Sequence, residues 1–373
     1  MPRWMAVAIA STFFSGEPAQ AQVRIEYVAH ACFVVESPGG VRALVDPYNG
    51  TRWLGYSFPA GLDADLVLVS HSHYDHDASY YAPADAPVLS RPGAYAVGDL
   101  RVTGIEGRHA EPWGAEFGGT NTLWLIETGG LRVAHLGDSG PLSTAAVHAL
   151  GQVDVLILPV DDQDHILKRA EVAAIRTSLR PAVTLPMHYR LAQLSALPDS
   201  LGTVDGWLGE QRNVVRPGSH TTVLRERPAE PQVLVLSPSP EVKPWRDALK
   251  AAFEHRSRAR ALAGQPDGRD AAIVELRQAA SLAPESMLFE FELAKALVEA
   301  GQENEAVPLL ESALAAAGRD DREYTARARD LLAGLYARRG EGERAAQQYL
   351  LVLRDEPRFE LRARAEVFLE KRR

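Results

Sequence analysis

The sequence has a single cysteine, Cys32, so no disulfide can form within the chain. It also lacks an excess of positive charge. The net charge is −9, and residues 1–240 hold 25 acidic and 17 basic residues, whereas residues 241–373 hold 24 and 23. Nucleic-acid binding depends on Lys and Arg side chains that neutralise phosphates, so the acidic first part disfavours a nucleic-acid partner. No apolar run is long enough for a transmembrane helix, so we expect no stable membrane span.

The first 21 residues have the pattern of a secretory signal peptide. Arg3 precedes the apolar stretch Met5–Phe14, and Ala19-Gln20-Ala21 follows as a small-x-small cleavage site. The alternative is an ordinary buried helix followed by a chance Ala-Gln-Ala. The pattern predicts cleavage after Ala21 and a periplasmic or secreted mature protein.

The length of 373 residues suits two domains. From residue 22, short β-rich runs alternate with helical patterns such as Arg169–Leu179. The continuous apolar run Asp65–Val69 is typical of a strand that is buried on both faces. Residues 22–240 are therefore predicted to be an α+β domain, an αββα sandwich of two mixed sheets with helices outside. The proline-rich residues 226–244 mark its end.

Residues 241–373 are rich in Ala, Leu, Glu and Arg with helical periodicity, and part of the pattern repeats. Leu293-Ala294, Leu297, Gly301 and Ala306 recur about 39 residues later as Leu332-Ala333, Tyr336, Gly340 and Ala345. The pattern resembles the tetratricopeptide repeat, a helix-turn-helix unit. The resemblance implies a groove for a peptide or for a second copy of the chain. A generic bundle of helical hairpins is the alternative.

A cluster of metal-binding residue types follows directly on the apolar run Asp65–Val69. Three histidines and an aspartate fall within six residues, in the segment His71-Ser72-His73-Tyr74-Asp75-His76. Neutral imidazole is the commonest metal ligand, and side chains at the end of a buried strand can converge on one cavity. A solvated polar loop is the alternative.

The spacing resembles the H-x-H-x-D-H signature of the metallo-β-lactamase superfamily, and the resemblance covers approximately residues 23–226. Further ligand candidates follow in the order of that family. They are His109 in Gly107-Arg108-His109-Ala110, Asp138 in Gly137-Asp138-Ser139-Gly140, and His188 in Pro186-Met187-His188-Tyr189.

By this resemblance, His71, His73 and His109 bind one metal, whereas Asp75, His76 and His188 bind a second. Asp138 bridges the two metals, and Asp138 and Asp75 are the expected catalytic carboxylates. Two neighbouring cations lower the pKa of a shared water and act as Lewis acids. A ligand set of His and Asp without thiolate suits Zn²⁺, which we expect, but it leaves Mn²⁺ and Fe open.

Within the superfamily, the chain is most similar to the ascorbate-6-phosphate lactonase-like group. The resemblance includes the segments His30-Ala31-Cys32-Phe33 and Leu44-Val45-Asp46-Pro47. Several true β-lactamases use a Cys ligand, and Cys32 lies too early in the chain for that role. The resemblance implies hydrolysis of an ester, lactone, amide or phosphodiester bond in a small-molecule substrate.

Four further residues are weaker candidates for the surroundings of the metals. Asp46 is expected to orient a ligand histidine, as carboxylates beside metal sites commonly do. His30 is expected either to line the site or to be a hydrogen-bonded structural histidine. Tyr74 and Tyr189 adjoin ligands, and their alternatives are substrate contact and loop packing. No spacing recommends His165, and Asp161–His165 is interpreted as a polar surface loop, with a substrate-facing loop as the alternative.

A different class of function is a binding protein, in which the helical repeats recruit a partner and the metal domain is an auxiliary scaffold. The intact ligand set argues against this, because a scaffold needs no metal-binding side chains. A nuclease of the same superfamily is disfavoured by the acidic first domain. The sequence therefore predicts a metal-dependent hydrolase with an attached helical region.

Overall fold

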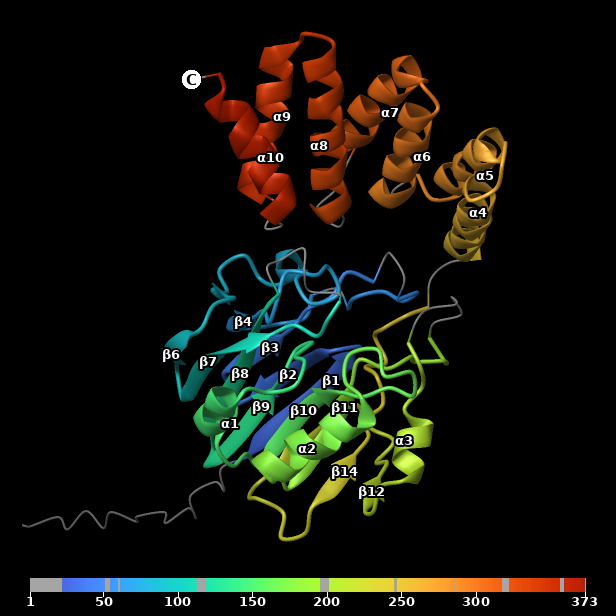
Figure 1. Cartoon of the computed structure of the whole chain (residues 1–373). Coiled ribbons are helices and arrows are strands. Elements are labelled where there is room, and N and C mark those ends of the chain that lie inside the picture. The colour runs from blue at the N-terminus through green and yellow to red at the C-terminus, as the bar shows by residue number, and fades with distance from the viewer. Residues whose placement is uncertain are drawn as a thin grey trace, which may run out of the picture.

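The computed structural model describes residues 22–50, 54–59, 61–112, 119–194, 201–244, 247–284, 286–316, 322–355 and 359–372. The predicted signal peptide, residues 1–21, lies outside the described residues. The first part of the chain forms two sheets that pack face to face (Figure 1). One is a six-stranded sheet in the order β13 (Thr221–Leu224), β1 (Val23–Ala29), β2 (Cys32–Glu36), β3 (Arg42–Val45), β4 (Leu66–Leu68) and β5 (Val88–Leu89).

The second sheet has eight strands. Their order is β12 (Val214–Val215), β14 (Gln232–Leu234), β11 (Val183–Met187), β10 (Val155–Pro159), β9 (Leu131–His135), β8 (Thr120–Thr128), β7 (Leu100–Arg108) and β6 (Gly93–Val97). Helices α1 (Thr144–Leu150), α2 (Arg169–Leu179) and α3 (Asp205–Gly209) follow β9, β10 and β11, and they lie outside this sheet. A short 3₁₀ helix, η1 (Ser79–Tyr81), follows β4 in the chain. The predicted α+β sandwich is confirmed, and α2 has the predicted bounds.

The sandwich is held together by apolar side chains that fill the space between the sheets. β10 is buried along its whole length, because one face meets the other sheet and helices cover the opposite face. Trp124 on β8 is fully buried in this core. Each fully buried Leu, Ile or Val side chain contributes about 1.5–3 kcal/mol relative to exposure. This packing fixes the strand ends from which the candidate site is built.

The strand directions bring distant parts of the sequence to one edge of the sandwich. β3 and β4 are parallel, and β2 is antiparallel to both β1 and β3, so β1, β3 and β4 end on the same side. In the other sheet β9, β10 and β11 are parallel, and β8 is antiparallel to both β7 and β9. The loops at the carboxyl ends of β1, β3 and β4 in one sheet, and of β7, β9, β10 and β11 in the other, therefore lie close together although they are far apart in the chain.

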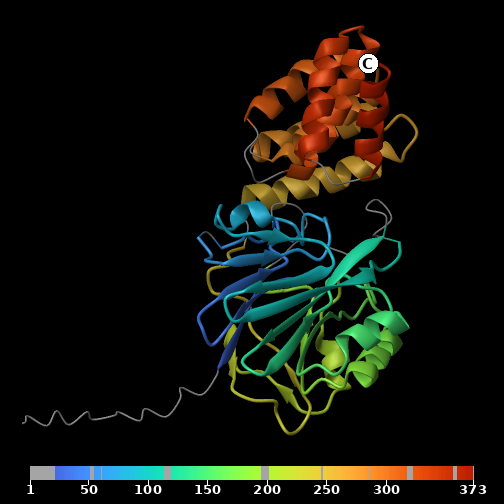
Figure 2. The ribbon, with the colours of Figure 1, turned by 90° about the vertical axis from the view of Figure 1, so that its left-hand side faces the viewer.

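The second part of the chain is helical and lies at one end of the sandwich (Figures 1 and 2). Consecutive helices pack against one another around a core of their own. None of the helices in the described part of the chain is long and apolar enough to cross a membrane. The helices are α4 (Asp247–Ala263), α5 (Arg269–Leu282), α6 (Met287–Glu299), α7 (Glu303–Ala316), α8 (Arg322–Arg338), α9 (Gly342–Asp355) and α10 (Phe359–Glu370).

Candidate metal centre

The site is formed by loops at the carboxyl ends of the strands. His71, His73, Asp75 and His76 lie in the turn after β4. Within this turn the backbone N–H groups of His76 and Asp77 both donate to the carbonyl oxygen of His73, at 2.9 and 2.7 Å. The tight turn projects several ligand-type side chains from one short segment. His109 follows β7, Asp138 follows β9 and His188 follows β11, whereas His30 lies between β1 and β2.

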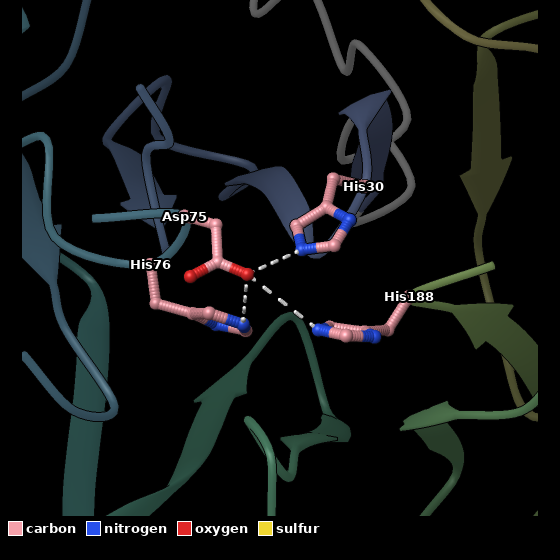
Figure 3. Close-up of side chains that lie close together, drawn as sticks. All are labelled: His30, Asp75, His76 and His188. Carbon is pink, nitrogen blue, oxygen red and sulfur yellow. Dashed lines mark hydrogen bonds and ion pairs between the residues drawn. The ribbon is translucent and has the colours of Figure 1, made fainter. Parts of the chain in front are cut away.

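The side chains converge in two groups whose ligand atoms lie within 4.8 Å of one another. Each cluster contains three histidines and one aspartate. All these residues are buried except His73, which is partly exposed. The first cluster is His71, His73, His109 and Asp138, and the second is His30, Asp75, His76 and His188 (Figure 3).

Asp138 lies between the clusters. Its Oδ1 is 3.2 Å from Nε2 of His76, and its Oδ2 is 3.2 Å from Nε2 of His188. The same Oδ2 is 3.7 Å from Nε2 of His109 and 3.9 Å from Nε2 of His71. One carboxylate therefore faces histidines of both clusters, as the bridging position requires. All seven expected ligands lie here, and the structure adds His30 beside Asp75 and His188.

The backbone before Asp138 needs a glycine. Gly137 has a φ of +54°, and a Cβ there would lie 2.4 Å from Cβ of Ser70 and 2.5 Å from Oδ1 of Asn121. Left-handed backbone and this close approach both exclude a side chain. The turn is further fixed to the His109 loop, because Ala110 N–H donates to the carbonyl oxygen of Asp138 at 2.9 Å. The placement of Asp138 thus depends on Gly137.

The residues present fit divalent metals. In the described structure the Nε2 atoms of His76, His109 and His188 and Oδ1 of Asp138 are buried but make no hydrogen bond. Buried polar atoms are normally hydrogen-bonded. Several buried polar atoms that lack a hydrogen bond and face the same space therefore indicate a ligand at that place. Imidazole nitrogen and carboxylate oxygen are suitable donors for Zn²⁺ and related ions.

Charges within the site move the pKa values of its histidines in opposite directions. Burial and the neighbouring His76 lower the pKa of His71, and burial lowers the pKa of His109. Burial also opposes protonation of His188, but the carboxylates of Asp138 and Asp75 together outweigh burial and raise the pKa of His188 to about 9. Burial and His188 lower the pKa of His30 to about 4. Before a metal binds, the second cluster thus holds protonated histidine.

The buried carboxylate of Asp46 orients two ligand histidines of the turn after β4, His76 directly and His71 through Ser70. Asp46 accepts hydrogen bonds from Ser70 N–H at 2.7 Å and from Ser70 Oγ at 2.6 Å, and its Oδ2 lies 2.8 Å from Nδ1 of His76. Ser70 Oγ is also 3.0 Å from Nδ1 of His71. Contacts at Nδ1 leave Nε2 of both ligand histidines directed at the clusters. The sequence predicts this orienting role for Asp46.

Three residues of the site have left-handed backbone conformations that residues other than glycine rarely adopt. The φ angles are 55° for His30, 47° for Asp46 and 59° for His188. Such conformations cost roughly 1–3 kcal/mol each and are found where the surroundings over-determine them, often at functional sites. The backbone of His188 is held by a 3.1 Å hydrogen bond from its N–H to the carbonyl oxygen of His30.

The two weaker tyrosine candidates differ in position. Tyr189 is buried beside Tyr27, and burial raises its pKa to about 12. This position corresponds to the packing alternative. Tyr74 is partly exposed and lies near Arg256 of α4. Burial lowers the pKa of Arg256, but Glu292 outweighs burial and raises it, and Tyr74 adds to the rise. Tyr74 in the ligand loop and Arg256 in the helical region therefore interact electrostatically.

Sequence reasoning missed His165. The sequence favours a polar surface loop after β10 over a substrate-facing loop, but the imidazole of His165 stacks on that of His188, with ring centroids 5.7 Å apart and planes at 16°. The position of the loop at the carboxyl end of β10, between the ligand-bearing strands β9 and β11, was the available signal. His135, in contrast, has a structural role, because its Nε2 lies 2.8 Å from the carbonyl oxygen of Ala31.

Comparison with known proteins agrees with this geometry. Residues 24–188 match the family model described as the beta-lactamase superfamily domain. A UPF0173 family protein of Pyrococcus furiosus is 31% identical, with 45% of this chain and 83% of the relative covered. The chain belongs to the metallo-β-lactamase superfamily. A UPF0173 metal-dependent hydrolase of Thermoplasma acidophilum is 26% identical, with 50% of this chain and 92% of the relative covered.

A solved structure of a metallo-β-lactamase superfamily protein from Thermotoga maritima is 30% identical, with a TM-score of 0.49, and 58% of this chain and 100% of that chain are covered. The UPF0173 relatives place the chain among the metal-dependent hydrolases of the metallo-β-lactamase superfamily. The family model ends at His188, the last of the expected ligands in the chain.

Proposed function

We propose that the protein is a dinuclear hydrolase that cleaves an ester, lactone, amide or phosphodiester bond of a small molecule with an activated water. The observation that carries this proposal is the position of Asp138, whose two oxygens face histidines of both clusters. Two divalent metals, of which Zn²⁺ is our choice over Mn²⁺ or Fe, would supply a water of lowered pKa and polarise the oxygen of the substrate. A substrate like those of the ascorbate-6-phosphate lactonase-like group fits this proposal.

The residues of the chain have separate tasks in this proposal. Each cluster would hold one metal, and Asp138 would be available as a ligand to both. Asp75 places a second carboxylate on the side of the second cluster, 3.7 Å from Nε2 of His188. Asp46 and Ser70 keep the imidazole rings of His76 and His71 in their binding orientations. Burial excludes bulk water from all of these groups except the partly exposed His73, which strengthens their electrostatic interactions.

The test is metal analysis combined with a substrate panel. Protein purified without chelators is expected to contain about two metal ions per chain by mass spectrometry, because its ligands form two clusters. The panel contains lactone, aryl ester, phosphodiester and β-lactam substrates. Activity on at least one is expected to disappear after chelation and to return with Zn²⁺, Mn²⁺ or Fe²⁺. Hydrolysis that survives complete metal removal would overturn the proposal.

We further propose that the helical region is a tetratricopeptide-like array that binds a peptide or a second copy of the chain. Gly301 and Gly340, about 39 residues apart, both end helices with left-handed φ angles of 76° and 78°. The repeated positions Ala306 and Ala345 are fully buried. Analytical ultracentrifugation tests self-association. A strictly monomeric protein that retains no peptide from a random library would contradict this part.

Export is the third part of the proposal, and it rests on the pattern of residues 1–21. Sequencing the N-terminus of protein recovered from the periplasm or medium is expected to find Gln22 first. Recovery of an uncleaved chain from the cytoplasm would contradict it.

A further inference from the structure

The loop between β10 and α2 is built by two aspartates that serve its backbone. Asp161 is buried, and its carboxylate accepts hydrogen bonds from His165 N–H at 2.9 Å and from Gly202 N–H at 2.7 Å. Asp162 accepts hydrogen bonds from Gly206 N–H and Trp207 N–H at the start of α3, both at 2.9 Å. Both carboxylates thereby hold the loop in one conformation. The aspartates at positions 161 and 162 therefore shape the loop and are not only solvated surface charges.

The loop conformation turns one side chain towards the metal centre. Asp164 has a φ of 54°, and the chain then places His165 over the ring of His188. The carboxylates of Asp138, Asp161 and Asp75 all act electrostatically on the imidazole of His165. Directly after it, Ile166 and Leu167 are buried and anchor the end of the loop in the core. His165 is thus held beside the second cluster from both sides of the loop.

His165 differs from the ligand histidines in two respects. Its ring nitrogens do not join either group of ligand atoms that lie within 4.8 Å of one another. Its side chain is also partly exposed, whereas those of His76 and His188 are buried. An imidazole beside the metal ligands, outside their cluster and open towards solvent, is positioned to meet a molecule that enters the site.

We propose that His165 is a substrate-binding residue that donates a hydrogen bond to an oxygen of a tetrahedral oxyanion held at the second cluster. Imidazole carries at least one N–H in either protonation state, so this role does not depend on a proton being gained or lost. A tetrahedral oxyanion is the chemistry common to a phosphoryl group and to the intermediate of ester or lactone hydrolysis. The inference rests on the dinuclear function proposed above.

The experiment uses the full-length, metal-loaded protein and inorganic phosphate as the probe. The variants are His165→Leu, which removes the donor, and His165→Gln, which keeps an N–H donor of similar reach. His148→Leu is the matched control, because His148 is exposed on α1. Calorimetry gives the phosphate dissociation constant, and mass spectrometry gives the metal content of each protein.

Loss of one hydrogen bond to a charged oxyanion is expected to weaken phosphate binding in His165→Leu roughly tenfold to a hundredfold. His165→Gln should recover part of this loss, and His148→Leu should match the wild type. All variants should keep the wild-type metal content.

Wild-type phosphate affinity in His165→Leu would overturn the inference alone. Loss of metal from both His165 variants would also overturn it, because His165 would then act on the metals. A wild-type protein that binds no metal when metal is supplied would instead overturn the proposed function together with the inference.

Discussion

The two ligand clusters differ in how their imidazole rings are arranged. In the first cluster the rings meet edge-on, at 84° between His71 and His73 and at 78° between His71 and His109. In the second, the rings of His76 and His188 are nearly parallel at 19°, and His165 continues the stack beyond His188. The first cluster reaches the surface at the partly exposed His73, whereas the ligands of the second are enclosed.

The clusters also differ in charge. Asp75 belongs to the second cluster alone, whereas Asp138, the carboxylate of the first cluster, also lies 3.2 Å from Nε2 of His76 and of His188 in the second. Two carboxylates favour cations beside them, which explains the raised pKa of His76 and His188, where the carboxylates outweigh burial. Without a second carboxylate, burial dominates at His71 and lowers its pKa. We infer that the second cluster binds a divalent cation more tightly.

The largest expected effect comes from Asp138→Ala, which removes the group that both clusters share. Loss of residues that only orient ligands typically costs 10–100-fold in metal affinity or activity, so loss of a shared ligand should exceed about a hundredfold. Metal content and hydrolysis of the substrate found in the panel are the measurements. The conservative Asp138→Glu variant should retain part of the metal. Unchanged activity in Asp138→Ala would rule out the bridging role.

Single ligand variants should separate the clusters. His109→Ala removes a histidine of the first cluster, and His188→Ala removes one of the second. Each protein is expected to keep about one metal per chain, since the opposite cluster and Asp138 remain. The metal kept by His109→Ala should resist chelators longer than the metal kept by His188→Ala, because its cluster has the additional carboxylate. Equal rates of metal loss would contradict the charge difference between the clusters.

A smaller effect is expected from Asp46→Asn. The amide cannot serve both Ser70 and His76 as the carboxylate does, so the orientation of His76 is loosened. A loss of roughly 10–100-fold in metal affinity is expected, mainly at the second cluster. Competition with a chromophoric chelator measures it, and Asp63→Asn at an exposed position is the control. Equal losses in both variants would mean that Asp46 has no specific role.

Much of this site could be predicted from the sequence, because its ligands follow strands and their spacing matches a known signature. The turn after β4 carries four ligands in one short segment, and His109, Asp138 and His188 each follow a strand. The role of His165 could not be predicted in this way. Its position depends on the φ of Asp164 and on the hydrogen bonds of Asp161 across to Gly202, which no local pattern encodes.

The same limit applies to His30 and to the helical region. His30 joins the second cluster because its own left-handed backbone conformation, between β1 and β2, turns its ring towards Asp75. Its Nε2 lies 3.1 Å from Oδ2 of Asp75. From the sequence, His30 could either line the site or be a hydrogen-bonded structural histidine. Helical periodicity predicted helices from residue 245 onward, but it did not predict the electrostatic interaction of Arg256 with Tyr74 in the ligand loop. Interactions of this kind follow from tertiary packing rather than from periodicity.

The smallest effect tests the difference in charge directly, through the protons released when metal binds. The raised pKa of His188, about 9, means that this ring is protonated in the metal-free protein at neutral pH, and a metal must displace its proton. Affinity at the second cluster should therefore rise with pH until the pH passes that value. His71 and His109 have lowered pKa values and are already neutral, so affinity at the first cluster should change little above neutral pH. Calorimetry of His109→Ala and His188→Ala in buffers of different ionisation enthalpy counts the protons. More protons should leave His109→Ala, which keeps the second cluster, and the reverse order would show that the carboxylates do not set the charge of these rings.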